Sequence, residues 1–185
     1  MRKAQGPGLV MIDRDGVINE DSGEFIKSVA EWRPIEGSLE AIAALSRTGW
    51  RVAVVTNQSG VGRGLYDEAT LAKIHEHMRE RVRAAGGELA GVYYCPHVPD
   101  DGCECRKPRP GLFRALERDL GVTVRGAPYI GDRISDVEAA ENVGARPMLV
   151  RTGTGASTEA LLGGRDVPVF DDLAAAARSL LEETR

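Results

Sequence analysis

The sequence predicts an α/β fold in which a doubly wound, mainly parallel sheet carries helices on both faces. Two observations predict it. Short apolar runs, rich in β-branched and aromatic residues, alternate along the chain with longer segments of helical periodicity. The runs are continuously apolar, which is typical of strands buried on both faces of a parallel sheet. Strands that alternate with helices in this way form doubly wound sheets.

Five strands are expected, each too short to be a helix. In chain order they cover residues 9–12, 52–55, 92–94, 128–130 and 148–150. Helices are expected where apolar residues recur every three or four positions. These segments cover about residues 39–45, 71–82, 111–120, 136–143 and 172–183.

Local features refine two of these segments. Asp67 is expected to cap the helix over 71–82. His75 and His77 lie among charged residues of that helix and are expected to face solvent. The Gly-rich stretch 153–165 is expected to be a surface loop.

The composition limits the kinds of protein that this chain can be. The chain has 185 residues, of which 28 are acidic and 24 basic, for a net charge of −4. We expect one domain over residues 1–185. The acidic balance argues against nucleic acid as a partner, because phosphate backbones require clustered cations. No apolar run approaches the roughly 18–20 residues of a membrane span, and Met1–Val10 contains a Gly-Pro-Gly break in place of a signal-peptide core. We therefore expect a cytoplasmic monomer that binds no membrane.

Two carboxylates follow the first predicted strand, at the sheet edge where ligands of such folds bind. Asp13 and Asp15 are separated by one residue, and Gly16 permits a turn after them. Two carboxylates that face one small volume repel each other unless a cation lies there, and hard oxygen ligands favour Mg²⁺. The alternative interpretation is an Asp-rich turn.

Polar residues also follow the next three strands. Residues 56–64 offer hydroxyl, amide and backbone donors in a Gly-rich loop that suits a phosphate oxygen. Arg106 and Lys107 follow the third strand, and Asp132 and Asp136 follow the fourth. Each feature alone has a simpler explanation, as a polar loop, surface charge or a helix cap. Their order along four successive strand ends favours one shared site.

These residues resemble the four motifs of the haloacid dehalogenase (HAD) superfamily of phosphotransferases. The matching segments are Asp13-Arg14-Asp15-Gly16, Thr56-Asn57, Lys107 and Gly131-Asp132 with Asp136. The resemblance covers about residues 9–150 and implies a phosphatase. It implies that Asp13 is the nucleophile, which forms an aspartyl-phosphate, and that Asp15 is the general acid and base. Thr56 and Lys107 would then stabilise the transferring phosphoryl oxygens.

The same resemblance implies a catalytic Mg²⁺. Its ligands would be the Asp13 carboxylate, the Asp15 backbone carbonyl, Asp132 and, through a water, Asp136. A hypothesis from another class is a receiver-like module that binds Mg²⁺ and phosphate without turnover. Such a module has no need of an acid/base carboxylate, so Asp15 argues against it.

Three cysteines and one histidine form a compact group between the third strand and Lys107. They are Cys95, His97, Cys103 and Cys105. An odd number of cysteines this close together cannot form a disulfide framework. Three thiols and one imidazole make a complete tetrahedral set for a structural Zn²⁺. The alternatives are a redox pair or three buried cysteines. Bound zinc would close the loop and direct Arg106 and Lys107 toward the site.

Within the superfamily, the chain is similar to the heptose 1,7-bisphosphate 7-phosphatase family and to the histidinol phosphatases. The first resemblance implies removal of the C7 phosphate of D-glycero-D-manno-heptose 1,7-bisphosphate, for lipopolysaccharide core precursors. Ser59, the Arg63-Gly64 continuation and Pro110-Gly111 match the heptose enzymes. Arg133 and residues 140–142 match the histidinol phosphatases. We therefore expect the substrate to be the heptose bisphosphate, with histidinol phosphate as the alternative.

The heptose pattern also implies how the substrate is bound. The residues it implies are Asp21, Ser22, Gly23, Glu24, Asn57, Gln58, Ser59, Arg106 and Arg133. Members of the superfamily often carry a separate cap domain, for which 185 residues leave no room. We therefore expect an open site whose specificity depends on the loops 20–36, 60–64 and 95–110.

Overall fold

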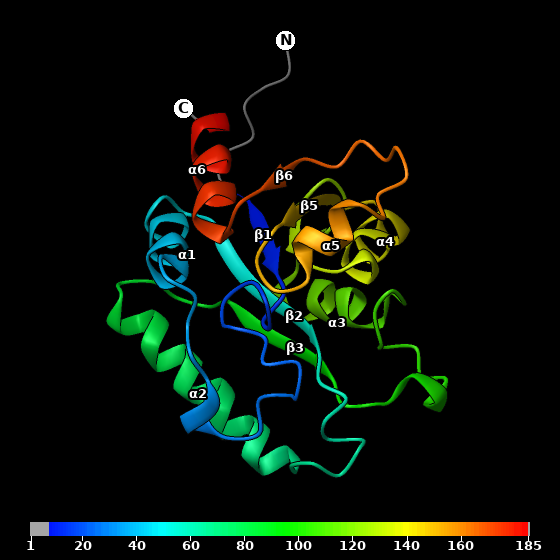
Figure 1. The fold of residues 1–185 in the computed structure, drawn as a ribbon. Helices are drawn as coiled ribbons and strands as arrows, with labels where there is room; N and C mark the ends of the chain where they lie inside the picture. Colours follow the sequence, from blue (N-terminus) through cyan, green and yellow to red (C-terminus); the bar gives the residue numbers. More distant parts are fainter. Residues whose placement is uncertain (1–7, 185) are drawn as a thin grey trace.

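The computed structural model describes residues 8–184, and a parallel six-stranded sheet lies at its centre (Figure 1). The strands are β1 (Leu9–Ile12), β2 (Arg51–Asn57), β3 (Gly91–Cys95), β4 (Pro128–Gly131), β5 (Arg146–Val150) and β6 (Val169–Phe170). Their spatial order is β3-β2-β1-β4-β5-β6, and all neighbouring pairs are parallel. The predicted parallel sheet is confirmed. Its sixth strand was not predicted, because two residues are too few to form a pattern.

Helices connect the strands and cover both faces of the sheet (Figure 1). They are α1 (Ser38–Arg47), α2 (Glu68–Ala84), α3 (Gly111–Leu120), α4 (Ile134–Val143), α5 (Gly155–Glu159) and α6 (Leu173–Glu183), with the short 3-10 helices η1 (Val29–Glu31) and η2 (Pro99–Asp101). The predicted cap of α2 is confirmed, because the Asp67 carboxylate accepts a hydrogen bond from the Thr70 amide. Capping satisfies a backbone donor that has no partner within the helix.

The sheet separates two apolar cores. Val10 and Ile12 of β1 belong to the core shared with α1, α2 and α6. Leu9 and Met11 belong to the core shared with α3 and α4. Successive side chains of a strand point to opposite faces, so a strand covered on both faces has to be apolar at every position. This explains the continuous apolar runs of the sequence.

The winding of the chain reverses at β1. From β1 the chain continues to β2 and β3 on one side, and later adds β4, β5 and β6 on the other. The loops that leave β1 and β4 therefore diverge and open a crevice at the carboxyl ends of these strands. The Asp13 amide donates to the Ile130 carbonyl at 2.9 Å, which places the residue after β1 at the end of β4.

Two local predictions are wrong. His75 is buried, with 6% of its surface exposed, because it lies on the side of α2 that faces the β1 loop and the Tyr94 ring. Its neighbour His77 is half-buried against Trp32. The stretch 153–165 is more than a surface loop, since it contains α5, in which Gly155 and Thr158 are buried.

Residues 1–7 lie outside the described part of the chain, and with them most of the Gly-Pro-Gly break. Among the helices of residues 8–184, none is both long enough and apolar enough to cross a membrane.

Candidate active site

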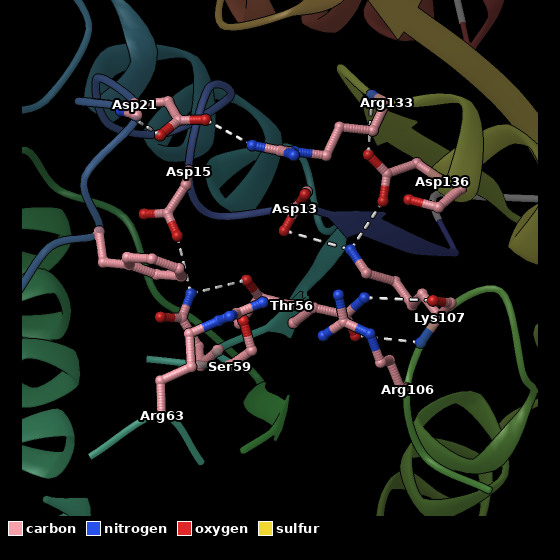
Figure 2. A pocket seen from close by; sticks show the side chains of 15 residues that line it. Asp13, Asp15, Asp21, Thr56, Ser59, Arg63, Arg106, Lys107, Arg133 and Asp136 are labelled. Atoms are coloured by element: carbon pink, nitrogen blue, oxygen red, sulfur yellow. Dashed lines mark hydrogen bonds and ion pairs between the residues drawn. The ribbon is translucent and has the colours of Figure 1, made fainter. Parts of the chain in front are cut away.

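A pocket of about 330 Å³ opens at the carboxyl ends of β1, β2 and β4 (Figure 2). Asp13 and Asp15 enter it from the β1 loop, and Thr56 enters from the end of β2. Lys107 and Asp136 line it next to Asp13. Carboxylates and cations thus face one small space, which suits a reaction between a carboxylate and a bound anion.

Lys107 is a buried ammonium surrounded by oxygen atoms. Its Nζ lies 2.7 Å from Asp136 Oδ1 and 3.3 Å from Asp13 Oδ1. It also donates to the Tyr129 hydroxyl at 2.6 Å and to the Val55 carbonyl at 3.0 Å. Burial alone would lower the pKa of this ammonium, but the two carboxylates outweigh it and raise the pKa above its usual value. Lys107 is therefore a fixed positive charge on the pocket wall.

Asp13 lies next to Lys107 with its carboxylate almost fully buried. Its Oδ1 accepts the backbone N–H of Arg14 at 2.7 Å. Burial raises the pKa of Asp13 to about 8, against the opposing effect of Lys107 and with help from Asp136 and Asp132. Without a further positive charge in the site, the Asp13 carboxyl group therefore holds a proton more readily than an exposed aspartate does.

Asp15 has the opposite environment. The Arg14 guanidinium donates to both carboxylate oxygens, from Nε at 2.9 Å and from Nη2 at 3.1 Å. Asn19 and Gln58 donate to the same carboxylate at 2.9 and 2.8 Å, and the Tyr66 hydroxyl fixes the Gln58 amide. Burial would raise the pKa of Asp15, but these donors outweigh it and lower the pKa.

Asp132 carries the clearest sign of a cation site. Its Oδ2 accepts the amide and the hydroxyl of Thr154 at 2.8 and 3.1 Å. Its Oδ1 is buried and has no hydrogen-bond partner. Oxygen atoms of Asp13, Asp132 and Asp136 lie within 4.8 Å of one another. Burial and the neighbouring Asp136 raise the pKa of Asp132 to about 6. An unpaired buried oxygen in a carboxylate cluster fits a hard cation such as Mg²⁺.

Asp136 is bound on both oxygens by the protein itself. Oδ1 accepts from Lys107 and from the Tyr129 hydroxyl at 3.0 Å. Oδ2 accepts the amides of Asp132 and Arg133 at 3.2 and 3.0 Å, at the start of α4. These four donors leave Asp136 better suited to hold a metal-bound water than to ligate a metal directly.

The thiols and the imidazole of the loop after β3 form a second cluster. Cys95 Sγ lies 3.1 Å from Cys105 Sγ, 3.6 Å from Cys103 Sγ and 3.4 Å from His97 Nδ1. Cys105 Sγ lies 3.2 Å from the same His97 nitrogen. Zinc–sulfur bonds of about 2.3 Å in a tetrahedron require sulfur atoms about 3.8 Å apart, so the cluster has nearly the size of a zinc site.

This cluster is joined to the pocket through Arg106 and Lys107. Arg106 Nη1 donates to the His97 carbonyl at 3.2 Å. The Asn57 side chain accepts the Lys107 amide at 3.0 Å and donates to the Lys107 carbonyl at 3.2 Å. The end of β2 and the cysteine loop therefore fix the backbone of Lys107 together.

The chain is similar to known phosphatases. Residues 104–176 match the Hydrolase_like family model, which describes HAD-like hydrolases. A Pseudomonas aeruginosa protein named D-glycero-β-D-manno-heptose-1,7-bisphosphate 7-phosphatase is 51% identical over 178 residues, covering 94% of this chain and 98% of that protein. The chain belongs to this phosphatase family. The names of such relatives favour the heptose phosphatase hypothesis over the histidinol phosphatase hypothesis. They also favour it over a module that binds phosphate without turnover.

Solved structures of heptose bisphosphate phosphatases share the fold. The D,D-heptose 1,7-bisphosphate phosphatase of B. bronchiseptica, complexed with magnesium and phosphate, matches with a TM-score of 0.91 and 47% identity, over 95% of this chain and 99% of that chain. The Burkholderia thailandensis enzyme matches with a TM-score of 0.74 and 38% identity, over 94% and 98% of the two chains. The prediction of an HAD-like fold is confirmed.

Most residues that the heptose phosphatase pattern implied for substrate binding line the pocket. They are Asp21, Gly23, Asn57, Gln58, Ser59, Arg106 and Arg133. Ser22 and Glu24 do not line it. The Ser22 hydroxyl donates to the Phe25 carbonyl and accepts the Glu24 amide, so both residues shape the loop behind the pocket.

Several residues of this site carried no sequence signal. Tyr129 and Tyr66 each use a hydroxyl inside the site, but their positions read as an apolar strand and a loop. Phe25 lines the pocket as well. The guanidinium of Arg63, which belongs to the loop 60–64 expected to contribute to specificity, lies 5.7 Å from the centre of the Phe25 ring. Thr154 holds Asp132 from the Gly-rich stretch that was expected to be a surface loop. The position of that stretch after the fifth predicted strand was the one available hint.

Loss of the zinc cluster is expected to weaken both the fold and the pocket. The change is Cys103→Ser, or chelation of the metal in the wild-type protein. Melting temperature should fall by about 5 °C or more, since each kcal/mol lost lowers it by about 2–4 °C in a chain of this size. Activity should fall because Lys107 loses its support, while Mg²⁺ affinity changes little. Metal analysis, calorimetry and kinetics measure this. Unchanged melting and kinetics in zinc-free protein would contradict it.

Mg²⁺ affinity is expected to rise with pH. A cation needs the ionised carboxylates, but Asp13 and Asp132 hold protons up to about pH 8 and about pH 6. Binding below pH 8 must displace the Asp13 proton, so affinity should rise about tenfold per pH unit from pH 6.5 to 7.5 and level off above 8. Titration calorimetry in buffers of different ionisation enthalpy counts the released proton. Asp13→Asn is the control and should remove this proton release. A pH-independent affinity in the wild type would contradict the assignment.

Proposed function

We propose that this chain is a Mg²⁺-dependent phosphatase that removes the C7 phosphate of D-glycero-β-D-manno-heptose 1,7-bisphosphate, for lipopolysaccharide core precursors. The observation that carries the proposal is the meeting of Asp13, Asp15 and Lys107 in one pocket, in a chain 51% identical to a phosphatase of that name. The relatives' names specify the β anomer, which the sequence alone leaves open.

In the first half of the reaction, an Asp13 oxygen attacks the phosphorus and forms an aspartyl-phosphate. The bond between phosphorus and the C7 oxygen breaks, and Asp15 gives a proton to that oxygen as it leaves. The four donors around Asp15 favour its ionised form. A phosphate dianion bound beside it adds negative charge and raises its pKa, which makes the proton available when substrate is present.

In the second half, water attacks the phosphorus of the aspartyl-phosphate. Asp15, now a carboxylate, accepts a proton from that water, and the bond between phosphorus and the Asp13 oxygen breaks. Inorganic phosphate leaves, and Asp13 is restored. The Lys107 ammonium and the Thr56 hydroxyl stabilise the negative charge on the phosphoryl oxygens in both halves.

The donor set fits a bound Mg²⁺. Asp13, Asp132 through its unpaired Oδ1, and the Asp15 carbonyl would hold it, with Asp136 binding a metal water. The bound ion supplies positive charge that offsets the repulsion between Asp13 and the phosphate. The cysteine cluster would hold a structural Zn²⁺ that supports Lys107.

Three arginines at the pocket give the substrate its second point of recognition. Arg63, Arg106 and Arg133 all line the pocket, and Arg133 pairs with Asp21 at 2.6 Å. These cations and the Asp21 carboxylate suit the second phosphate and the hydroxyl groups of the sugar. Specificity then rests on the loops around the pocket, within one domain of residues 1–185.

We place the reaction in the cytoplasm. Cys95, Cys103 and Cys105 are free thiols, and a site that needs thiols as metal ligands persists where they stay reduced.

Asp13→Asn is expected to abolish turnover, because the nucleophile is lost. Wild-type protein with Mg²⁺ should release the C7 phosphate and retain the C1 phosphate, which phosphorus NMR distinguishes. Its kcat/KM should be highest on the β-heptose bisphosphate, compared with the α anomer and histidinol phosphate. The variant should lose about 10³-fold or more in kcat. Asp166→Asn, at an exposed aspartate, is the matched control. No phosphate release by the wild type, or a preference for histidinol phosphate, would overturn the proposal.

Asp15→Asn is expected to bind Mg²⁺ normally but to depend on a good leaving group. The loss in kcat/KM should be about 10²–10⁴-fold on the heptose bisphosphate and on phenyl phosphate, because the leaving oxygen receives no proton. On p-nitrophenyl phosphate the loss should stay below about tenfold, because nitrophenolate leaves without a proton. kcat/KM is the right quantity, since it covers the steps only through departure of the alcohol. Equal losses on both aryl phosphates would rule out an acid role for Asp15.

A further inference from the structure

His75 lies on the buried side of α2, directly behind the loop that carries the two catalytic carboxylates. Its neighbours on that side of the helix are the fully buried apolar residues Leu71, Ile74 and Met78. Its Nε2 lies 3.1 Å from Nη1 of Arg14, a residue 61 positions away in sequence. A polar ring thus lies in an apolar helix face and contacts a buried cation.

Arg14 is the link between His75 and the pocket. Its side chain is fully buried, and its Nε and Nη2 donate to the two oxygens of Asp15. The remaining nitrogen, Nη1, points to His75. A buried guanidinium whose donors lack acceptors is strongly unfavourable, so the acceptor at Nη1 decides whether this side chain keeps its place.

The imidazole is suited to accept this hydrogen bond. Burial, together with the charge of Arg14, lowers the pKa of His75 to about 3, against the opposing effect of Asp15. A neutral ring has a lone pair available on one nitrogen, whereas a protonated ring would repel the guanidinium. The Tyr94 ring, 5.5 Å from the imidazole between centroids, supports it from β3.

We propose that His75 is a positioning residue for the general acid, acting through Arg14. By accepting from Nη1, His75 fixes the plane of the guanidinium, and this plane sets the direction of the Asp15 carboxylate. Asn19 and Gln58 each hold one carboxylate oxygen, whereas Arg14 contacts both and so sets the rotation of the group. The inference rests on the proposed acid role of Asp15.

The test compares two replacements of His75. Phenylalanine keeps the ring against Tyr94 and removes the acceptor. Glutamine places an amide oxygen near the position of Nε2 and restores it. The matched control is His77→Phe on the same helix. Each variant is assayed with Mg²⁺ for kcat/KM on the heptose bisphosphate, phenyl phosphate and p-nitrophenyl phosphate, with melting temperature and Mg²⁺ affinity measured alongside.

A positioning role gives a pattern that depends on the leaving group. In His75→Phe, kcat/KM should fall about 10–100-fold on the heptose bisphosphate and about tenfold or more on phenyl phosphate, because a displaced acid protonates the leaving oxygen poorly. On p-nitrophenyl phosphate, kcat/KM should fall less than about threefold. His75→Gln and the control should stay within about threefold of wild type on all three substrates.

Other results overturn the inference. Equal losses of kcat/KM on the two aryl phosphates in His75→Phe would indicate a general structural effect. No loss on any substrate would show that the contact between His75 and Arg14 has no role in catalysis. Should the Phe variant fail to fold, His75→Asn against His75→Gln gives the same test, since asparagine is one carbon too short to reach Arg14. If Asp15→Asn itself lacks the leaving-group pattern, the acid role of Asp15 is wrong and the inference fails with it. If Asp15→Asn shows the pattern and His75→Phe does not, the inference alone is wrong.

Discussion

The buried ammonium of Lys107 is the interaction on which the rest of the site depends. Asp13, Asp136 and Tyr129 all contact it, and these residues come from the β1 loop, the start of α4 and β4. A single positive charge thus joins elements that the winding of the sheet brings to one edge. Several carboxylates cannot be buried together unless cations offset their charge. Lys107 provides one such cation, and the unpaired oxygen of Asp132 marks the place of another.

The position of Lys107 is in turn set by the end of β2 and by the cysteine loop. Asn57, at the end of β2, binds both backbone polar groups of Lys107. The cysteine loop holds the preceding residue, Arg106, through the His97 carbonyl. A loop rich in proline, aspartate and glycine has little apolar surface to bury, so a metal cluster is an efficient way to order it. Zinc bound by Cys95, His97, Cys103 and Cys105 would therefore support catalysis by holding the backbone that carries Lys107.

The sequence predicts the sheet and the convergence of Asp13, Thr56 and Lys107 because both follow from local rules. Apolar runs mark strands, and the ends of parallel strands meet at one edge. It does not predict contacts made across the fold by ordinary residues. Tyr129 reads as one more buried strand residue, yet its hydroxyl joins Lys107 to Asp136. His75 lies among charged neighbours in the sequence, and only the packing of α2 against the β1 loop reveals its contact with a buried arginine.

The two carboxylates of the β1 loop, two residues apart, end in opposite electrostatic environments. Asp15 meets a guanidinium and two amides, which lower its pKa, whereas burial, helped by the neighbouring carboxylates, raises the pKa of Asp13 to about 8. Environments that separate the pKa values of neighbouring acids assign them different roles. A cation bound at Asp132 would offset the excess negative charge and favour the ionised form of Asp13, the proposed nucleophile. The reactive form of Asp13 would thereby depend on metal occupancy.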